Sequence, residues 1–134
     1  MSIEFPLVPV HSDIGILYKP YIPTLLKTPV GVLRLSFLLD SGADYSLAPC
    51  LLAKTLGIEL NTLPSKKVSG LEGGKVKGKL GELSGEIAGH PFKARCLFTD
   101  RNDVPSILGR LDFFDQFDIC FDAKKRLVIL NPIK

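Results

Sequence analysis

Cysteine is scarce in this sequence, and tryptophan is absent. Cys50, Cys96 and Cys120 are far apart and odd in number, so they provide neither a disulfide framework nor a metal-ligand spacing. We expect reduced, buried thiols and no metal. No apolar run approaches the ~20 residues that cross a bilayer, and the N-terminus lacks the basic and apolar regions of a signal peptide. These absences predict a cytoplasmic protein without a membrane partner.

A large excess of one charge is also missing. The chain has 17 Lys and Arg against 14 Asp and Glu, a formal net charge of +3. This excess is too small to indicate binding to nucleic acid. The length of 134 residues and the hydrophobic content of 46% are typical of one globular domain with a real core. We expect an N-terminal arm at 1–15 and a single domain at 16–134.

One stretch combines an apolar strand with polar residues that can do chemistry. Residues 32–39 alternate between apolar and polar side chains, which predicts a strand with one buried face. The strand leads into Asp40, Ser41 and Gly42. Glycine permits a tight turn or a close backbone approach. A carboxylate at the end of a rigid strand is well placed to be held still, although the same residues also suit an ordinary turn.

Residues 38–44, Leu-Leu-Asp-Ser-Gly-Ala-Asp, resemble the active-site signature of the aspartic peptidases, Asp-Thr/Ser-Gly followed by a small residue. They are most similar to the retroviral-type, single-domain members, the retropepsins. A second segment, Ile107-Leu108-Gly109-Arg110, resembles the apolar-apolar-Gly-Arg segment before the C-terminal helix of that family. The resemblance covers about residues 16–131. It implies an all-β fold, a closed β-barrel of the acid-protease type with a flap hairpin and one or two short helices.

The remaining pattern is mostly that of strands. Prolines interrupt residues 16–27, so this strand should lie at an edge or be broken. A short helix is expected within residues 48–57, between a proline and a glycine. Alternation or apolar character predicts further strands at 80–87, 91–98, 117–122 and 127–130.

Residues 65–90 are rich in glycine and lysine, which suggests a mobile hairpin. The resemblance makes this hairpin the flap that closes over bound peptide, with its tip in Gly70, Leu71, Glu72, Gly73 and Gly74. A solvated hairpin without function is the alternative. The five lysines from Lys66 to Lys79 are interpreted as a solubilising face, since nothing in the sequence supports a preference for acidic substrates.

The resemblance assigns a role to each residue of the first motif. Asp40 would be the catalytic carboxylate, Ser41 would bond across a dimer axis, and Gly42 would offer its carbonyl to the peptide. Ala43 has no hydroxyl to stabilise the outer carboxylate oxygen, which predicts a mildly acidic activity optimum. No cofactor is required.

Two further charged residues match a supporting ion pair of the retroviral members. We expect Asp44 and Arg110 to form a bidentate pair, with unrelated surface charges as the alternative.

This chemistry needs two carboxylates that share a proton, and the chain has one Asp-Ser-Gly. The second carboxylate should therefore come from a homodimer with the two Asp40 residues near the two-fold axis. We expect an aspartic endopeptidase that acts on peptides or proteins. The alternatives are a catalytically silent retropepsin-like dimer for peptide binding or assembly, and a small structural β-domain.

Overall fold

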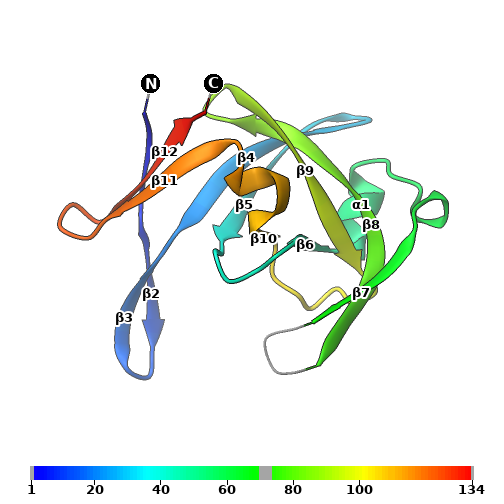
Figure 1. The fold of residues 1–134 in the computed structure, drawn as a ribbon, viewed down its shortest axis with the longest axis horizontal. Coiled ribbons are helices and arrows are strands. Elements are labelled where there is room, and N and C mark those ends of the chain that lie inside the picture. Colours follow the sequence, from blue (N-terminus) through cyan, green and yellow to red (C-terminus); the bar gives the residue numbers. More distant parts are fainter. Residues whose placement is uncertain (1, 70–73, 134) are drawn as a thin grey trace.

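The structure, a computed structural model, describes residues 2–69 and 74–133. The chain is mostly β, as predicted (Figure 1). Its strands are β1 Ile3–Pro6, β2 Val8–Ser12, β3 Gly15–Lys19, β4 Tyr21–Thr28, β5 Gly31–Leu39, β6 Ser46–Pro49, β7 Ser65–Ser69, β8 Lys75–Ile87, β9 His90–Thr99, β10 Ile107–Leu108, β11 Phe117–Asp122 and β12 Leu127–Pro132. The helical elements are α1 Cys50–Thr55, the 3₁₀ turn η1 Leu60–Thr62 and the irregular turn η2 Arg110–Phe114.

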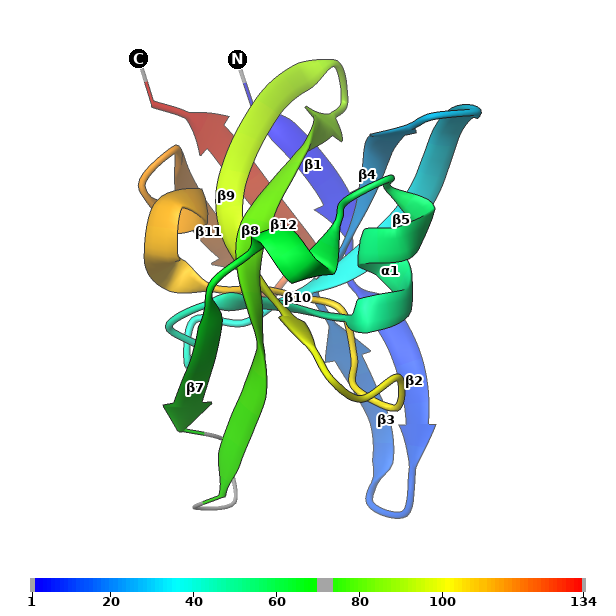
Figure 2. The same ribbon diagram turned by 90° about the vertical axis from the view of Figure 1, so that its right-hand side faces the viewer.

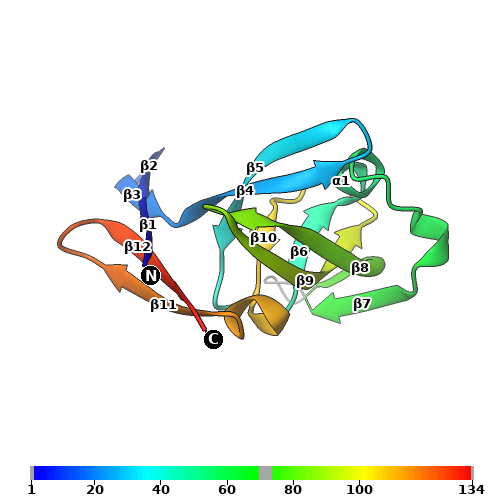
Figure 3. The same ribbon diagram turned by 90° about the horizontal axis from the view of Figure 1, so that it is seen from above.

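The largest sheet has seven strands in the order β4-β5-β10-β6-β9-β8-β7. β4 pairs a second time, with β8, so the strand at one end of this order also reaches a strand near the other end. Seen from above, β4, β5, β8 and β9 surround the short strands β6 and β10 (Figure 3). The two short strands therefore lie at the centre of the sheet.

The β4–β5 hairpin forms as predicted. The chain breaks at Pro20, between β3 and β4, because proline cannot donate a ladder hydrogen bond. The turn after Thr28 leads into β5, where Phe37 and Leu39 are buried while Arg34 is exposed. The alternation therefore fixes which face of β5 meets the core.

Helix α1 is shorter than the expected 48–57. Ala48 and Pro49 belong instead to the end of β6, which pairs in parallel with β9. Pro49 precedes the first helical residue, and Gly57 follows the end of the helix at a positive φ of 77°, which glycine adopts readily. The proline and the glycine predicted at the two ends do flank the helix, but the helix begins later than expected, at Cys50.

The N-terminal segment contains more strand than an extended arm requires. β1 pairs with β12 of the same chain, and β12 lies between β1 and β11 in a three-stranded sheet. β2 and β3 form a hairpin that crosses the expected boundary at residue 15. In two perpendicular views this hairpin and the β7–β8 hairpin project towards the same end of the molecule, away from the chain ends (Figures 1 and 2).

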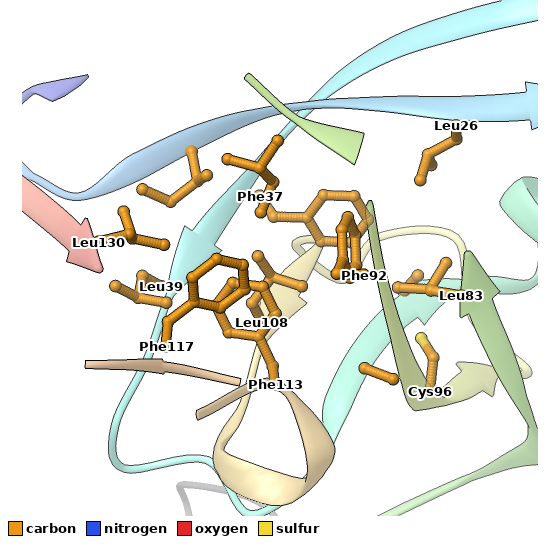
Figure 4. Close-up of a cluster of buried hydrophobic side chains, with 14 of the residues drawn as sticks. Leu26, Phe37, Leu39, Leu83, Phe92, Cys96, Leu108, Phe113, Phe117 and Leu130 are labelled. Carbon is orange, nitrogen blue, oxygen red and sulfur yellow. The ribbon is translucent and has the colours of Figure 1, made fainter. Parts of the chain in front are cut away.

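A cluster of aromatic side chains lies beneath the strands that carry the motifs (Figure 4). Phe113 from η2 is fully buried, with its ring centroid 5.6 Å from that of Phe92 and 5.0 Å from that of Phe117. Leu39 and Leu108 enter the same core. The ends of β5 and β10 are therefore anchored by tight packing.

The three cysteines are free thiols, but they are not equally buried. Burial raises the pKa of the Cys96 thiol, as expected for a buried group. Cys50 is half-buried, and Cys120 is exposed, so the prediction of a buried thiol is wrong for Cys120. Cys120 lies on the outward face of β11, opposite the face of buried Phe117.

Candidate active site

Asp40 follows the last residue of β5, where the strand has neighbours on both sides. The Leu39 N–H donates to the Pro20 carbonyl at 2.9 Å, and the Asp40 N–H donates to the Leu108 carbonyl at 3.0 Å. β5 pairs in parallel with β10 through Leu38 and Leu39. The main chain of Asp40 is thus held by the sheet itself, as the sequence predicted for a carboxylate at the end of a strand.

The turn after Asp40 fixes the carboxylate as well. The Gly42 N–H donates to Asp40 Oδ1 at 2.8 Å, and the Ala43 N–H donates to the Asp40 carbonyl at 3.2 Å. Asp40 is half-buried, whereas Ser41 and Gly42 are exposed. A main-chain donor therefore orients one oxygen of a carboxylate that still reaches the surface.

The second motif is bonded directly to the first. The Arg110 N–H donates to the Ala43 carbonyl at 2.8 Å, and the Leu111 N–H donates to the Asp44 carbonyl at 2.8 Å. Gly109 passes so close that a Cβ on it would lie 2.3 Å from the Tyr45 carbonyl oxygen. This contact explains why the position holds a glycine, which permits a close backbone approach.

Sequence reasoning missed Ser46, which supports the same contact. Ser46 is fully buried, and its hydroxyl oxygen accepts the Gly109 N–H at 3.1 Å. The acceptor satisfies a buried main-chain donor that β10 leaves unpaired. A serine beside an apolar segment gives little signal, because its partner is 63 residues away.

The predicted ion pair between Asp44 and Arg110 is not formed in this structure. Ion pairs within the described part of the chain join Arg95 to Asp112 and Arg101 to Asp103. Main-chain hydrogen bonds already hold the two segments together, and the Arg110 guanidinium lies 5.8 Å from the centre of the Phe114 ring. Asp44 and Arg110 are therefore neighbours through their backbones.

Asp112, two residues after Arg110, forms a bidentate ion pair with Arg95. Asp112 Oδ2 accepts the Arg95 backbone N–H at 2.8 Å and Nε–H at 2.9 Å, and Oδ1 accepts Nη2–H at 3.1 Å. Asp112 has a positive φ of 67°, which aspartate and asparagine tolerate better than most residues. The Arg95 guanidinium and N–H hold the pKa of the Asp112 carboxyl below its usual value. These bonds attach η2 to β9.

We expect Asp112→Asn to remove the part of the stability that depends on this charge. A carboxyl whose pKa is lower in the folded state stabilises the fold above its unfolded value of about 4, and this contribution disappears as the pH falls through the folded pKa. The variant should therefore be less stable than the parent at pH 7, with the difference shrinking below about pH 4. Urea unfolding at several pH values measures this. A difference independent of pH would contradict the assignment, since asparagine keeps the backbone conformation.

Asp40 opens onto a cavity of about 510 Å³. One wall is the loop from Asp40 to Tyr45, another is residues 104–107, and the β7–β8 hairpin contributes residues 66–69 and Val76. The predicted flap tip falls mainly on residues 70–73, outside the described residues, while Gly74 is exposed. The cavity thus lies between the Asp-Ser-Gly motif and the base of the predicted flap.

Neither a metal site nor a membrane-spanning helix is found among the described residues. Across residues 2–69 and 74–133, no group of three or more His, Cys, Asp or Glu side chains is arranged to hold a metal ion. In the same residues, no helix is long and apolar enough to cross a membrane. The polar side chains that line the cavity carry carboxylates (Asp40 and Asp44), ammonium groups (Lys66 and Lys67) and hydroxyls (Tyr45 and Ser69).

Together, the strand order and the two bonded motifs define the fold of a retropepsin-like aspartic protease. The structure is similar to the crystal structure of a retropepsin-like aspartic protease from Rickettsia conorii, with a TM-score of 0.68 and 24% sequence identity. The match covers 98% of this chain and 92% of that chain. No family model matches the sequence. No curated protein matches it either.

Proposed function

We propose that the protein is a homodimeric aspartic endopeptidase, in which two Asp40 carboxylates, one per subunit, activate a water molecule to hydrolyse peptide bonds. The observation that carries this proposal is the position of Asp40, oriented by the Gly42 N–H at the edge of a cavity of about 510 Å³. The fold adds support, because it is shared with an aspartic protease. The chain has a single Asp-Ser-Gly, so a second copy must supply the second carboxylate.

The chemistry follows from the distance between two such carboxylates. Two charges ~3 Å apart at an effective dielectric of ~20 repel by about 5 kcal/mol, so the pair retains one proton. The ionised carboxylate takes a proton from water as the oxygen attacks the peptide carbonyl, and the protonated one donates to the carbonyl oxygen. Collapse of the tetrahedral intermediate then breaks the C–N bond: the leaving amine takes the proton that the first carboxylate removed from water, and the second carboxylate takes back a proton from a hydroxyl of the intermediate.

The neighbours of Asp40 take supporting roles in this proposal. Ser41 and Gly42 are exposed, which leaves them available to a second copy and to the peptide. Ser41 bonds across the dimer axis, and the Gly42 carbonyl accepts from the peptide main chain. Ala43 has no hydroxyl to stabilise the outer oxygen of Asp40, so the activity optimum is mildly acidic.

The architecture that we propose around the site is a closed barrel with a flap. The second pairing of β4, with β8, supports the closure. The flap is the β7–β8 hairpin, because residues 66–69 and Val76 line the cavity that contains Asp40. We place the enzyme in the cytoplasm, with peptides or proteins as substrates and no cofactor.

A dilution experiment tests the need for two subunits. We expect hydrolysis of a peptide library between about pH 4 and 7, with activity per chain falling as dilution dissociates the dimer. Sedimentation measured over the same concentrations should show the dimer disappearing in parallel. A strict monomer that cuts peptides at full rate would contradict the proposal. A stable dimer that cuts nothing would favour the catalytically silent peptide-binding or assembly module.

A further inference from the structure

Lysines dominate one face of the β7–β8 hairpin. The antiparallel register pairs Ser65 with Lys79, Lys67 with Lys77 and Ser69 with Lys75. Directly opposed residues of an antiparallel pair lie on the same face. The face therefore carries four lysines, Lys67, Lys75, Lys77 and Lys79.

This face borders a hollow. A cavity of about 660 Å³ lies between the hairpin, α1 and the end of β9. The charged residues that line it are five lysines and one carboxylate: Lys54, Lys66, Lys67, Lys77, Lys79 and Asp100. We call this space the lysine cavity. Four of these lysines are exposed and Lys79 is half-buried, and all five belong to the residues that line one concavity, where clustered charge of one sign raises the local concentration of anions.

Among the described residues that line the lysine cavity, Asp100 is the one carboxylate beside five lysines, and Lys79 Nζ donates to the Ser65 hydroxyl at 3.0 Å. Lys67 and Lys77 are directly opposed, and like charges in that position are destabilising. The ion pairs found among the described residues involve arginines, and none includes a lysine of this cavity. A bound anion would relieve the repulsion between these lysines.

The lysine cavity adjoins the cavity that contains Asp40. Lys66 and Lys67 line both spaces, and the Lys66 ammonium lies 5.6 Å from the centre of the Tyr45 ring, beside the catalytic loop. A chain that leaves the catalytic cavity along β7 therefore meets the lysines next.

We propose that the lysine cavity binds an acidic segment of the protein substrate, outside the residues at the scissile bond. This inference rests on the proposed function, because it gives that function its substrate class. Clustered cations attract clustered carboxylates and raise the association rate at low salt.

An acidic peptide suits the cavity better than a nucleic acid does. Phe98, the aromatic residue in its lining, is 1% exposed, so its ring offers no face on which a base could stack. The net charge of +3 is also small for a nucleic-acid-binding chain.

The first test measures binding without hydrolysis. The full-length Asp40→Asn protein is titrated into a hexaglutamate peptide with an uncharged dye, and into the matching hexaglutamine peptide, by fluorescence anisotropy. Hexaglutamate should bind about tenfold more tightly at low salt, with the preference weakening as salt is added. Equal binding of the two peptides would overturn the inference without any substitution in the cavity.

Variants then locate the binding. Lys67→Gln/Lys77→Gln should remove most of the preference for hexaglutamate, whereas Asp100→Asn should strengthen it. Lys124→Gln/Lys125→Gln, which removes the same charge from the turn between β11 and β12, should leave it unchanged. Equal losses in the two double variants would show a response to net charge alone and would overturn the inference.

The last experiment distinguishes a failure of this inference from a failure of the proposed function. The unsubstituted protein is given a peptide substrate with an acidic extension on either side, and the same peptide with glutamines. Preferred cleavage of the acidic peptide supports both proposals. Cleavage without preference overturns the lysine cavity alone, and a binding preference without any cleavage overturns the peptidase alone. An oligonucleotide that binds more tightly than hexaglutamate would overturn the choice of an acidic peptide.

Discussion

Replacing Asp40 by asparagine should lower the rate of peptide hydrolysis by about 10³-fold, within the range found when a general acid or base is removed. Asparagine cannot take a proton from water, and a symmetric dimer loses both carboxylates at once. The fold should persist, because the asparagine Oδ1 can still accept the Gly42 N–H that Asp40 accepts at 2.8 Å. The prediction therefore separates chemistry from folding.

The measurement is the initial rate on a fluorogenic peptide, with thermal unfolding as the check on the fold. Asp118→Asn is a matched control, because Asp118 is an exposed carboxylate on β11. The control should retain the activity of the parent. If Asp40→Asn keeps a rate within tenfold of the parent, Asp40 is not the catalytic carboxylate.

The second large effect is expected from Gly109→Ala. The added Cβ would lie 2.3 Å from the Tyr45 carbonyl oxygen and 2.9 Å from that of Ala43. The φ of Gly109 is −98°, which any residue adopts, so the effect is steric. The loop that follows Asp40 must shift away from β10, at a cost of about 1–3 kcal/mol in folding free energy. A shift of about 1 Å at the carboxylate can also lower the rate by about 10²-fold.

Urea unfolding and kcat/KM together measure this variant. Gly74→Ala is the stability control, because a Cβ there meets no atom of the described residues within 4 Å. Its free energy of unfolding should stay within about 0.5 kcal/mol of the parent. A Gly109→Ala protein with parental stability and activity would show that the two motifs are not held in contact.

The sequence was most informative where local pattern and local structure agree. The alternation in residues 32–39 predicted β5, and the prolines predicted the break before β4. The turn at Asp40 also followed from residue type. Each of these features depends on backbone rules that act within a few residues.

Features that depend on distant partners could not be predicted in the same way. Ala48 and Pro49 became strand instead of helix because β9, about fifty residues later, offers parallel pairing. Asp112 pairs with Arg95 and has a positive φ, and the residues next to Asp112 give no sequence signal for that backbone conformation. Tertiary contacts of this kind override local propensity.

The resemblance also had limits at the level of single side chains. It supplied an ion pair between Asp44 and Arg110, whereas main-chain bonds join these segments here and the Arg110 side chain lies beside Phe114. The resemblance thus predicted which two segments lie side by side. The side-chain contacts between them depend on the packing of this chain.

The hydrogen bond from the Asp40 N–H to the Leu108 carbonyl has a consequence for amide exchange with solvent. This amide is bonded between central strands above a buried core, so its deuterium uptake should require the opening of β5 from β10. Ser41, the next residue, is exposed. The border between slow and fast exchange should therefore fall between the amides of Asp40 and Ser41, and the main chain of Asp40 should move only when the centre of the sheet opens.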